Sequence, residues 1–285
     1  MLVIIGYVVC LGCIFGVYIA HGGNISVILH ALPFEIITIM GGALGAFVVN
    51  NQAKVLKSTL KTLPTVMKGS KYTKARYMEL MSLLYDILQK ARKDGLMAIE
   101  KDVETPHDSE IFKKYPTVGS DHHVVEFMTD YLRMMVSGNL NSHEIESLMD
   151  SEIETHHQEA HAPIAALARL AGALPAFGIV AAVLGVVNTM GSVGQPPSVL
   201  GGMIGSALVG TFMGVLLAYG VVSPLAGRLK QVIDADAAIY DVVKQIIIAS
   251  LHGHPQPLVI EAARSGIDHK NQPGFAEVFD GLRGK

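Results

Sequence analysis

The sequence contains no tryptophan, only two cysteines, and a small share of charged residues, 16% of 285. The two cysteines, Cys10 and Cys13, lie in one apolar run and cannot build the disulfide framework of a small secreted domain. Their spacing is that of a CxxC motif. Inside an apolar helix, however, they are better interpreted as small packing residues than as a redox or metal site.

Positive charge is missing from two long segments. None of the 22 Lys and Arg residues lies in residues 1–50 or 170–227. This distribution argues against nucleic-acid binding, which needs a basic surface. Half of all residues are hydrophobic, and they are bunched into runs that match the ~20 residues needed to cross a bilayer. The composition therefore predicts an integral membrane protein.

The apolar runs divide the chain into four parts. We expect two membrane helices in residues 1–50, a helical domain in 51–164, two more membrane helices in 165–223, and helices in a tail of 224–285. Lys and Arg near membrane helices mark the cytoplasmic side. Because the two short loops between helices have neither residue, the domain, the tail and both termini are expected in the cytoplasm of a bacterial cell, with the helices in its inner membrane.

The polar segments show helical periodicity. Leucine and isoleucine repeat every three or four residues around Leu84, which predicts an amphipathic helix over residues 72–93. Asn141 and Glu144 have the spacing of a capping box that begins another helix. The second membrane helix is expected to start at Pro33, and the last dozen residues are expected to be loosely ordered.

Small residues line the third and fourth membrane helices. Four fall on one helical face of the third (Ala171, Gly178, Ala182 and Gly185), and two GxxxG pairs occur in the fourth (Gly201 with Gly205, and Gly210 with Gly214). Small residues let membrane helices approach closely. Pro175 interrupts the third helix, and Thr211 places a hydroxyl at mid-depth in the fourth. Ordinary helix packing with a tolerated proline would explain all of these features.

Motifs for catalysis are missing. The chain has no phosphate-binding GxxxxGK[ST], no GxSxG, and no GxGxxG after a strand. His157 and His161 are four residues apart, but Gln158 stands where a zinc protease needs glutamate, so these histidines are interpreted as part of a solvated helix face. We therefore expect neither an enzyme nor a metal site or cofactor.

Ionisable groups are also missing from the middle of the four membrane helices. Glu35 could form the rim of a pore, although a solvated residue at a helix start is the simpler interpretation. Three alternatives follow: the protein does not conduct ions, it conducts through a hydrated path, or a partner chain supplies the carboxylate. The small-residue faces favour a partner, because they leave room for another helix.

Four long motifs resemble the MotA family of flagellar motor stator proteins. They are SKYTKARYMELMSLLYDIL at residues 70–88, DYLRMMVSGNLNSHEIESLMDSEIETH at 130–156, LPAFGIVAAVLGVV at 174–187 and LVGTFMGVLLAYGVVSPLA at 208–226. The resemblance implies four membrane helices with a large cytoplasmic insertion between the second and third. It also implies five copies around two copies of the partner MotB, which anchors to peptidoglycan and carries the membrane aspartate that this chain lacks.

The resemblance also implies roles for individual residues. Pro175 and Pro224 match the family prolines tied to torque generation, and Thr211 matches the threonine beside the partner's aspartate. Arg92 and Glu100 match the charged residues that meet the rotor switch protein FliG. Sodium-driven relatives carry a hydroxyl where this chain has Ala182. Because sodium needs several oxygen ligands, alanine there favours protons.

Two alternatives remain open from the sequence. The TolQ and ExbB energisers of outer-membrane processes belong to the same superfamily, but they usually have three membrane helices. A membrane scaffold that conducts no ions would need the small-residue faces only for packing.

Overall fold

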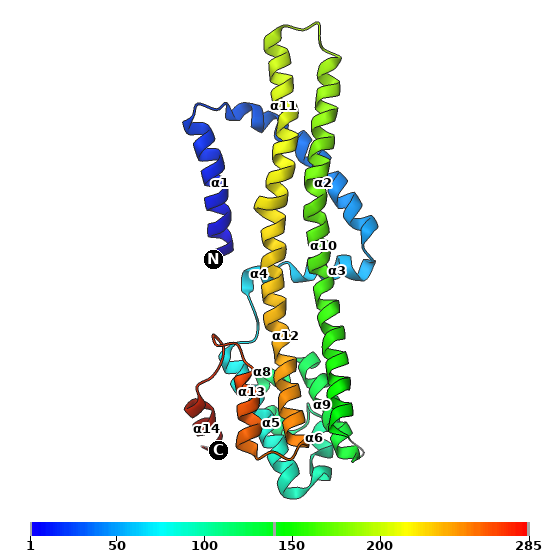
Figure 1. The fold of residues 1–285 in the computed structure, drawn as a ribbon, viewed down its shortest axis with the longest axis vertical. Coiled ribbons are helices and arrows are strands. Elements are labelled where there is room, and N and C mark those ends of the chain that lie inside the picture. The colour runs from blue at the N-terminus through cyan, green and yellow to red at the C-terminus, as the bar shows by residue number, and fades with distance from the viewer. Residues whose placement is uncertain (1, 139–140, 284–285) are drawn as a thin grey trace. The chain divides into compact units, whose positions relative to one another are not determined.

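The computed structural model describes residues 2–138 and 141–283, and every regular element in these ranges is a helix. The chain forms two compact units. The apolar unit comprises residues 1–69 and 160–232, and the polar unit comprises residues 70–159 and 233–285. The expected all-helical fold is therefore confirmed for the residues described, and Figure 1 shows its elements.

The apolar unit contains the long hydrophobic helices. Its elements are α1 (Leu2–Ala20), α2 (Ile25–Asn50), α3 (Ala53–Thr62), α4 (Thr65–Lys68), the later part of α10 (Ser142–Met190), α11 (Pro197–Val215), the π-helical segment η2 (Leu216–Val222) and the start of α12 (Ser223–Leu251). Within this unit α10 and α11 lie side by side and antiparallel (Figure 1). In the described part of the chain, four helical stretches are long and apolar enough to cross a membrane.

The start of the second long helix differs from the prediction. α2 begins at Ile25, not at Pro33, and the side chain of Asn24 caps it by accepting a hydrogen bond from the Ser26 backbone N–H at 3.1 Å. Pro33 lies inside the helix. A cap satisfies an N–H that would otherwise lack a partner, so the helix can start there. Pro33 then removes one N–H from the hydrogen bonds inside the helix. Glu35 consequently lies about three turns inside α2.

Pro224 does not end the fourth long helix. α11, η2 and α12 run without interruption from Pro197 to Leu251. The π-helical turn immediately precedes Pro224. Its wider spacing accommodates a ring and a missing N–H that a regular α-helix does not accept. The Tyr7 hydroxyl on α1 donates a hydrogen bond of 3.0 Å to the Val221 carbonyl, which ties α1 to this turn.

The polar unit is built from shorter helices around a core of large side chains. Its elements are α5 (Lys74–Asp94), the 3₁₀ turn η1 (Leu96–Ile99), α6 (Glu100–Glu104), α7 (Glu110–Lys113), α8 (Pro116–Gly119), α9 (His122–Ser137), the first part of α10, most of α12, α13 (Gln256–Ser265) and α14 (Phe275–Arg283). The predicted amphipathic helix is confirmed as α5. The expectation of loose order at the C-terminal end was wrong, because α14 packs Val278 into the core.

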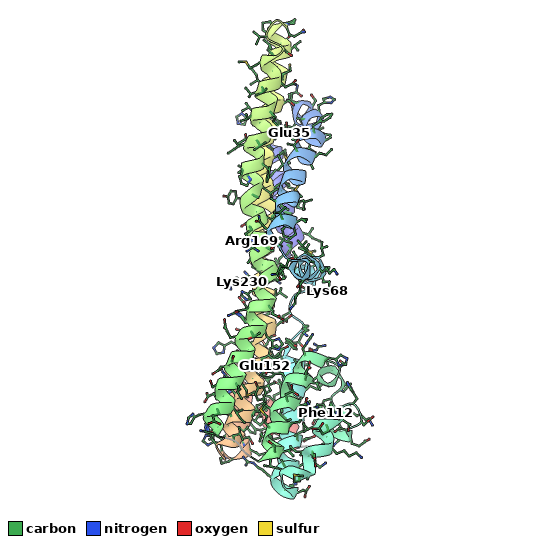
Figure 2. The ribbon with its side chains drawn as sticks, turned by 90° about the vertical axis from the view of Figure 1, so that its right-hand side faces the viewer. Glu35, Lys68, Phe112, Glu152, Arg169 and Lys230 are labelled. Carbon is green, nitrogen blue, oxygen red and sulfur yellow. The ribbon has the colours of Figure 1, made fainter. Side chains whose placement is uncertain are left out.

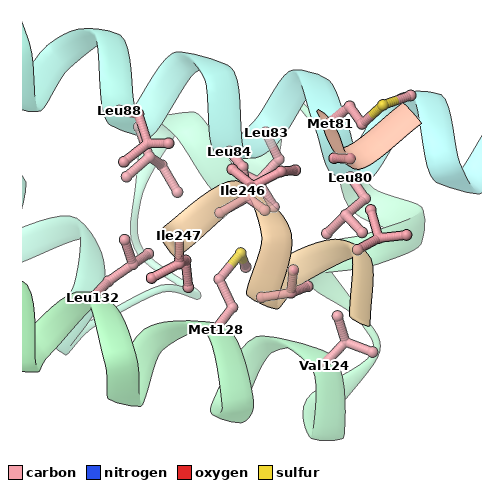
Figure 3. Close-up of a cluster of buried hydrophobic side chains, with 14 of the residues drawn as sticks. Leu80, Met81, Leu83, Leu84, Leu88, Val124, Met128, Leu132, Ile246 and Ile247 are labelled. Atoms are coloured by element: carbon pink, nitrogen blue, oxygen red, sulfur yellow. The ribbon is translucent and has the colours of Figure 1, made fainter. Parts of the chain in front are cut away.

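The apolar face of α5 meets α9 and α12 in this core. Leu80, Leu83 and Leu84 of α5 are fully buried, together with Met128 of α9 and Ile246 of α12 (Figure 3). Removal of these side chains from water is the main stabilising contribution to such a core. Burial also extends to the end of α5 through Ala91, so the last turn of α5 is held by the same core.

A buried carboxylate organises the edge of the core. Asp121, at the start of α9, accepts hydrogen bonds of 2.8 Å from Lys71 Nζ and from the Tyr72 hydroxyl. Burial alone would raise the pKa of Asp121, but the hydrogen bonds from Lys71 and Tyr72, with the nearby positive charge, hold it below its ordinary value. The ionised carboxylate therefore stabilises the junction between α9 and the segment before α5.

Candidate functional site

Three glycines, Gly178 of α10 with Gly210 and Gly214 of α11, let the two helices touch backbone to backbone. A Cβ atom added to Gly178 would lie 2.9 Å from the Gly210 carbonyl oxygen and 3.0 Å from the Gly214 Cα. A Cβ added to Gly214 would lie 2.8 Å from the Leu174 carbonyl oxygen. Carbon atoms do not approach backbone this closely, so no larger residue fits at either position. The predicted close-packing face is confirmed, and we call this contact the glycine seam.

The two GxxxG pairs of α11 have different environments. Gly210 and Gly214 face α10, whereas a Cβ at Gly201 would meet nothing within 4 Å, and one at Gly205 would make only an ordinary contact with Val27 at 3.5 Å. The pair at 201 and 205 instead lines an apolar cavity of about 470 Å³ between α1, α2 and α11. Only the second pair therefore belongs to the glycine seam.

Three of the residues predicted to serve the ion path lie along the seam. A Cβ at Gly210 would lie 3.1 Å from the backbone nitrogen of Ala182, so these two residues face each other. Thr211 is the next residue after Gly210 and is half-buried. Pro175 follows Leu174, whose carbonyl meets Gly214. α10 and α11 thus place Ala182 against Gly210, while Pro175 and Thr211 are the chain neighbours of the seam residues Leu174 and Gly210.

Pro224 lies elsewhere in the apolar unit. It follows η2 and lines a second cavity of about 450 Å³, together with residues of α1 such as Leu2 and Tyr7. The two prolines singled out from the sequence therefore have different surroundings. Pro175 lies inside α10 next to the seam, and Pro224 borders a widened helical turn that Tyr7 holds by its hydrogen bond.

Glu35 reaches the seam from α2. Its carboxylate oxygen Oε2 would lie 2.7 Å from a Cβ at Gly210. Figure 2 shows Glu35 where α2 passes α10. The interpretation of Glu35 as a solvated helix-start residue was wrong, because the helix begins earlier and the side chain is half-buried. Asn24, a typical N-cap residue ahead of the apolar run, was the feature that could have indicated this.

Arg92 and Glu100 lie on the surface of the polar unit, on either side of η1. Both are exposed, and between them the side chains of Leu96 and Met97 are 40% and 65% exposed. The Arg92 guanidinium donates a hydrogen bond to the His254 carbonyl. Opposite charges flanking two exposed apolar side chains form a surface suited to a protein partner. We call it the η1 surface.

The position of the η1 surface follows from the core behind it. Ala91 is buried just before Arg92, and Ile99, the last residue of η1, is buried just before Glu100. Lys90 pairs with Asp102 at 2.6 Å. Gly95 has a φ of +90°, which favours glycine and turns the chain from α5 into η1. The backbone under Arg92 and Glu100 is therefore held firmly while their charged groups stay in solvent.

Comparison with protein families identifies two matching models. Residues 4–95 match the N-terminal model of motility protein A, and residues 120–241 match the model of the MotA/TolQ/ExbB proton channel family. The chain is 44% identical over 283 residues to motility protein A of Escherichia coli strain K12, covering 99% of this chain and 95% of that protein. It is also 35% identical to the chemotaxis protein LafT of Vibrio parahaemolyticus, over 96% of this chain and 95% of that protein.

Solved structures share the fold. The structure of C. jejuni MotAB superposes with a TM-score of 0.74 at 22% identity, covering 94% of this chain and 95% of that one. The flagellar MotAB stator complex of Bacillus subtilis superposes with a TM-score of 0.68 at 23% identity, covering 90% and 92%. Together with the near full-length similarity to motility protein A, the two matching models show that this chain belongs to the MotA/TolQ/ExbB proton channel family.

Proposed function

We propose that this chain is a stator subunit of the bacterial flagellar motor, which couples proton flow across the inner membrane to torque on the rotor. The glycine seam supports the proposal, because Ala182 faces Gly210 there and Pro175 and Thr211 directly follow two seam residues, Leu174 and Gly210. The near full-length similarity to motility protein A supports the same function. The matching family is one of proton channels, so we propose a role in ion transport and no enzymatic reaction.

The proposed topology has four membrane spans with both termini in the cytoplasm. The hydrophobic stretches support four spans, and the Lys and Arg distribution supports the orientation. The proposed domain limits are residues 1–50 and 165–223 for the spans, and 51–164 and 224–285 for the cytoplasmic parts. Arg169 supports this limit, because it hydrogen-bonds Asn51 at 2.7 Å at the ends of two spans.

The proposed assembly is a pentamer around a MotB dimer. MotB would supply a membrane aspartate and the peptidoglycan anchor. Thr211 would line the path beside that aspartate, while Pro175 and Pro224 would let the helices move as it gains and loses its proton. Ala182 supports protons as the coupling ion, since a methyl group offers a sodium ion no ligand.

The η1 surface is the proposed contact with the rotor protein FliG. Arg92 and Glu100 would pair with opposite charges there, and Met97 would add apolar contact. Exposed ion pairs favour fast and reversible association that weakens with salt, which suits a motor that engages and releases its rotor repeatedly.

Swimming and proton influx test the proposal directly. Cells lacking their own stator genes would express this chain with MotB, in media with and without sodium. Cytoplasmic acidification would be measured with a MotB that lacks its plug, the segment that closes the idle channel. We expect motility and acidification without sodium, both lost when the MotB membrane aspartate becomes asparagine. Motility only with sodium would contradict the argument from Ala182. Assembled complexes without either activity would favour an energiser of the TolQ and ExbB type, or a scaffold.

A further inference from the structure

We propose that Glu35 is a proton-collecting carboxyl group of the ion path, seated in the notch that Gly210 leaves in the glycine seam. This inference rests on the proposed function, and it adds to this chain an acidic group besides the one expected from the partner.

The first observation is an unpaired carboxylate among apolar helices. Glu35 is the only acidic residue in residues 1–50, and residues 170–227 contain no Asp, Glu, Lys or Arg. Within the described chain, its carboxylate has no hydrogen bond or ion pair. An ionisable group without a partner is costly at membrane depth and is normally retained for a function. A structural role for Glu35 would require partners that these neighbours do not offer.

The second observation is the place of the carboxylate. Gly210 has no side chain at the point where Glu35 Oε2 approaches, and Ala181 and Ala182 form the other walls, each with an atom 3.1 Å from a Cβ at Gly210. Any side chain at position 210 would occupy the notch. The carboxylate therefore lies at the level of Ala182 and beside Gly210, the residue that precedes Thr211 in the chain. The proposed function assigns the ion path to Ala182 and Thr211.

Among the helices packed around Glu35, no other titratable side chain of the described residues lies at the level of Ala182 and Gly210. α11 and residues 170–190 of α10 contain no titratable side chain. On α2 itself His30 lies more than one turn earlier and is exposed, and α1 contributes only Tyr7, Tyr18 and the two cysteines. A lone negative group in a low-dielectric channel raises the local concentration of cations, and with no oxygen cage nearby the proton is the cation it can hold.

The test compares proton influx through complexes of this chain with plug-free MotB in liposomes. Glu35→Gln keeps the shape of the side chain but removes its proton site. We expect its influx at neutral external pH to fall about tenfold, the lower end of what charge focusing contributes to association rates. The deficit should shrink as external pH is lowered, because bulk protons then replace those that Glu35 collects. Glu35→Asp should keep most of the influx.

Glycine substitutions in one helix provide a matched pair. Gly210→Ala puts a methyl group 2.7 Å from the carboxylate oxygen, whereas Gly205→Ala makes an ordinary contact at 3.5 Å. We expect the first to lower influx and the second to leave it unchanged. If the methyl acts by displacing the carboxylate, the double variant Gly210→Ala with Glu35→Gln should conduct no worse than Gly210→Ala alone.

Two results would overturn the inference while leaving the proposed function intact. One is unchanged influx through assembled Glu35→Gln complexes at every external pH. The other is a deficit of constant size across pH, which would assign Glu35 a structural role. A wild-type complex that carries no protons would instead refute the proposed function.

Discussion

The helices of the apolar unit meet at glycines, whereas the helices of the polar unit meet through large buried side chains. In the apolar unit, α10 and α11 meet where side chains are missing, at Gly178, Gly210 and Gly214. In the polar unit, α5, α9 and α12 meet through large side chains such as Leu84 and Met128, which are fully buried. Larger residues should therefore disrupt the contact between α10 and α11, whereas smaller residues should destabilise the core of the polar unit.

The difference follows from the solvent that each unit is expected to face. In water, burying large apolar side chains is favourable, so a core of Leu, Ile and Met stabilises the polar unit. In a bilayer, lipid tails are as apolar as leucine, and burial gives no such advantage. Close backbone contact supplies dispersion and weak polar interactions instead, and glycine permits it. The large side chains of the apolar unit, such as Leu184, accordingly stay exposed on its surface.

The largest expected effect comes from filling the seam. Gly178→Val would force its side chain into the backbone of Gly210 and Gly214, which lie 2.9 and 3.0 Å from the Cβ position. Backbone cannot yield as a side-chain end can, so we expect α10 and α11 to separate and motility to be lost. Swimming in soft agar, with complex recovery from membranes, would measure this.

Gly172→Val is the matched control for the seam. It makes the same change in the same helix at a glycine whose added Cβ meets nothing within 4 Å. Motility should survive there. Equal loss in both variants would show that valine harms α10 through helix propensity, and would remove the seam as the explanation.

A smaller effect is expected from emptying the polar core. Leu84→Ala removes a fully buried side chain of α5, and truncations of this kind cost about 2–5 kcal/mol. Amide hydrogen exchange of α5 in the full-length protein would report the loss as faster exchange. Leu148→Ala, at a side chain 52% exposed in the same unit, should change exchange little. Equal exchange in both variants would contradict the comparison between the units.

Sequence patterns predicted the parts of the fold that depend on periodicity. The leucine repeat of α5 and the small residues around Gly178 and Gly210 recur at helical spacing, and both predictions are confirmed. The boundaries were less predictable. The apolar pattern predicts a helix start at Pro33, whereas the Asn24 cap places the start at Ile25. The nine-residue α14 has Phe275, Val278, Phe279 and Leu282 at helical spacing, a signal that the expectation of loose order overlooked. Val278 of this helix packs into the core.

The candidate site could be predicted only residue by residue. Helical spacing and a mid-depth hydroxyl point to Ala182 and Thr211, and the resemblance implies their roles. No periodicity connects them with Glu35, which lies on another helix. The contact depends on the absence of a side chain at Gly210. Because it brings residues of three helices together, no local sequence pattern predicts it. Periodicity likewise cannot predict that Arg92 and Glu100 contact a partner, because exposed charges are common on any helix surface.

The smallest expected effect tests whether glycine has a different purpose in the polar unit. Gly138 ends α9 with a φ of +77°, and a Cβ there would meet nothing within 4 Å. This glycine serves backbone conformation and not close packing. Gly138→Ala should destabilise the polar unit by about 1 kcal/mol, the cost of a left-handed conformation for an L residue. Gly138→Asn should cost less, because asparagine adopts that conformation more readily. Thermal unfolding of the full-length protein would measure both changes in stability. A loss of motility as severe as that of Gly178→Val would contradict the distinction between a glycine for backbone conformation and a glycine for close packing.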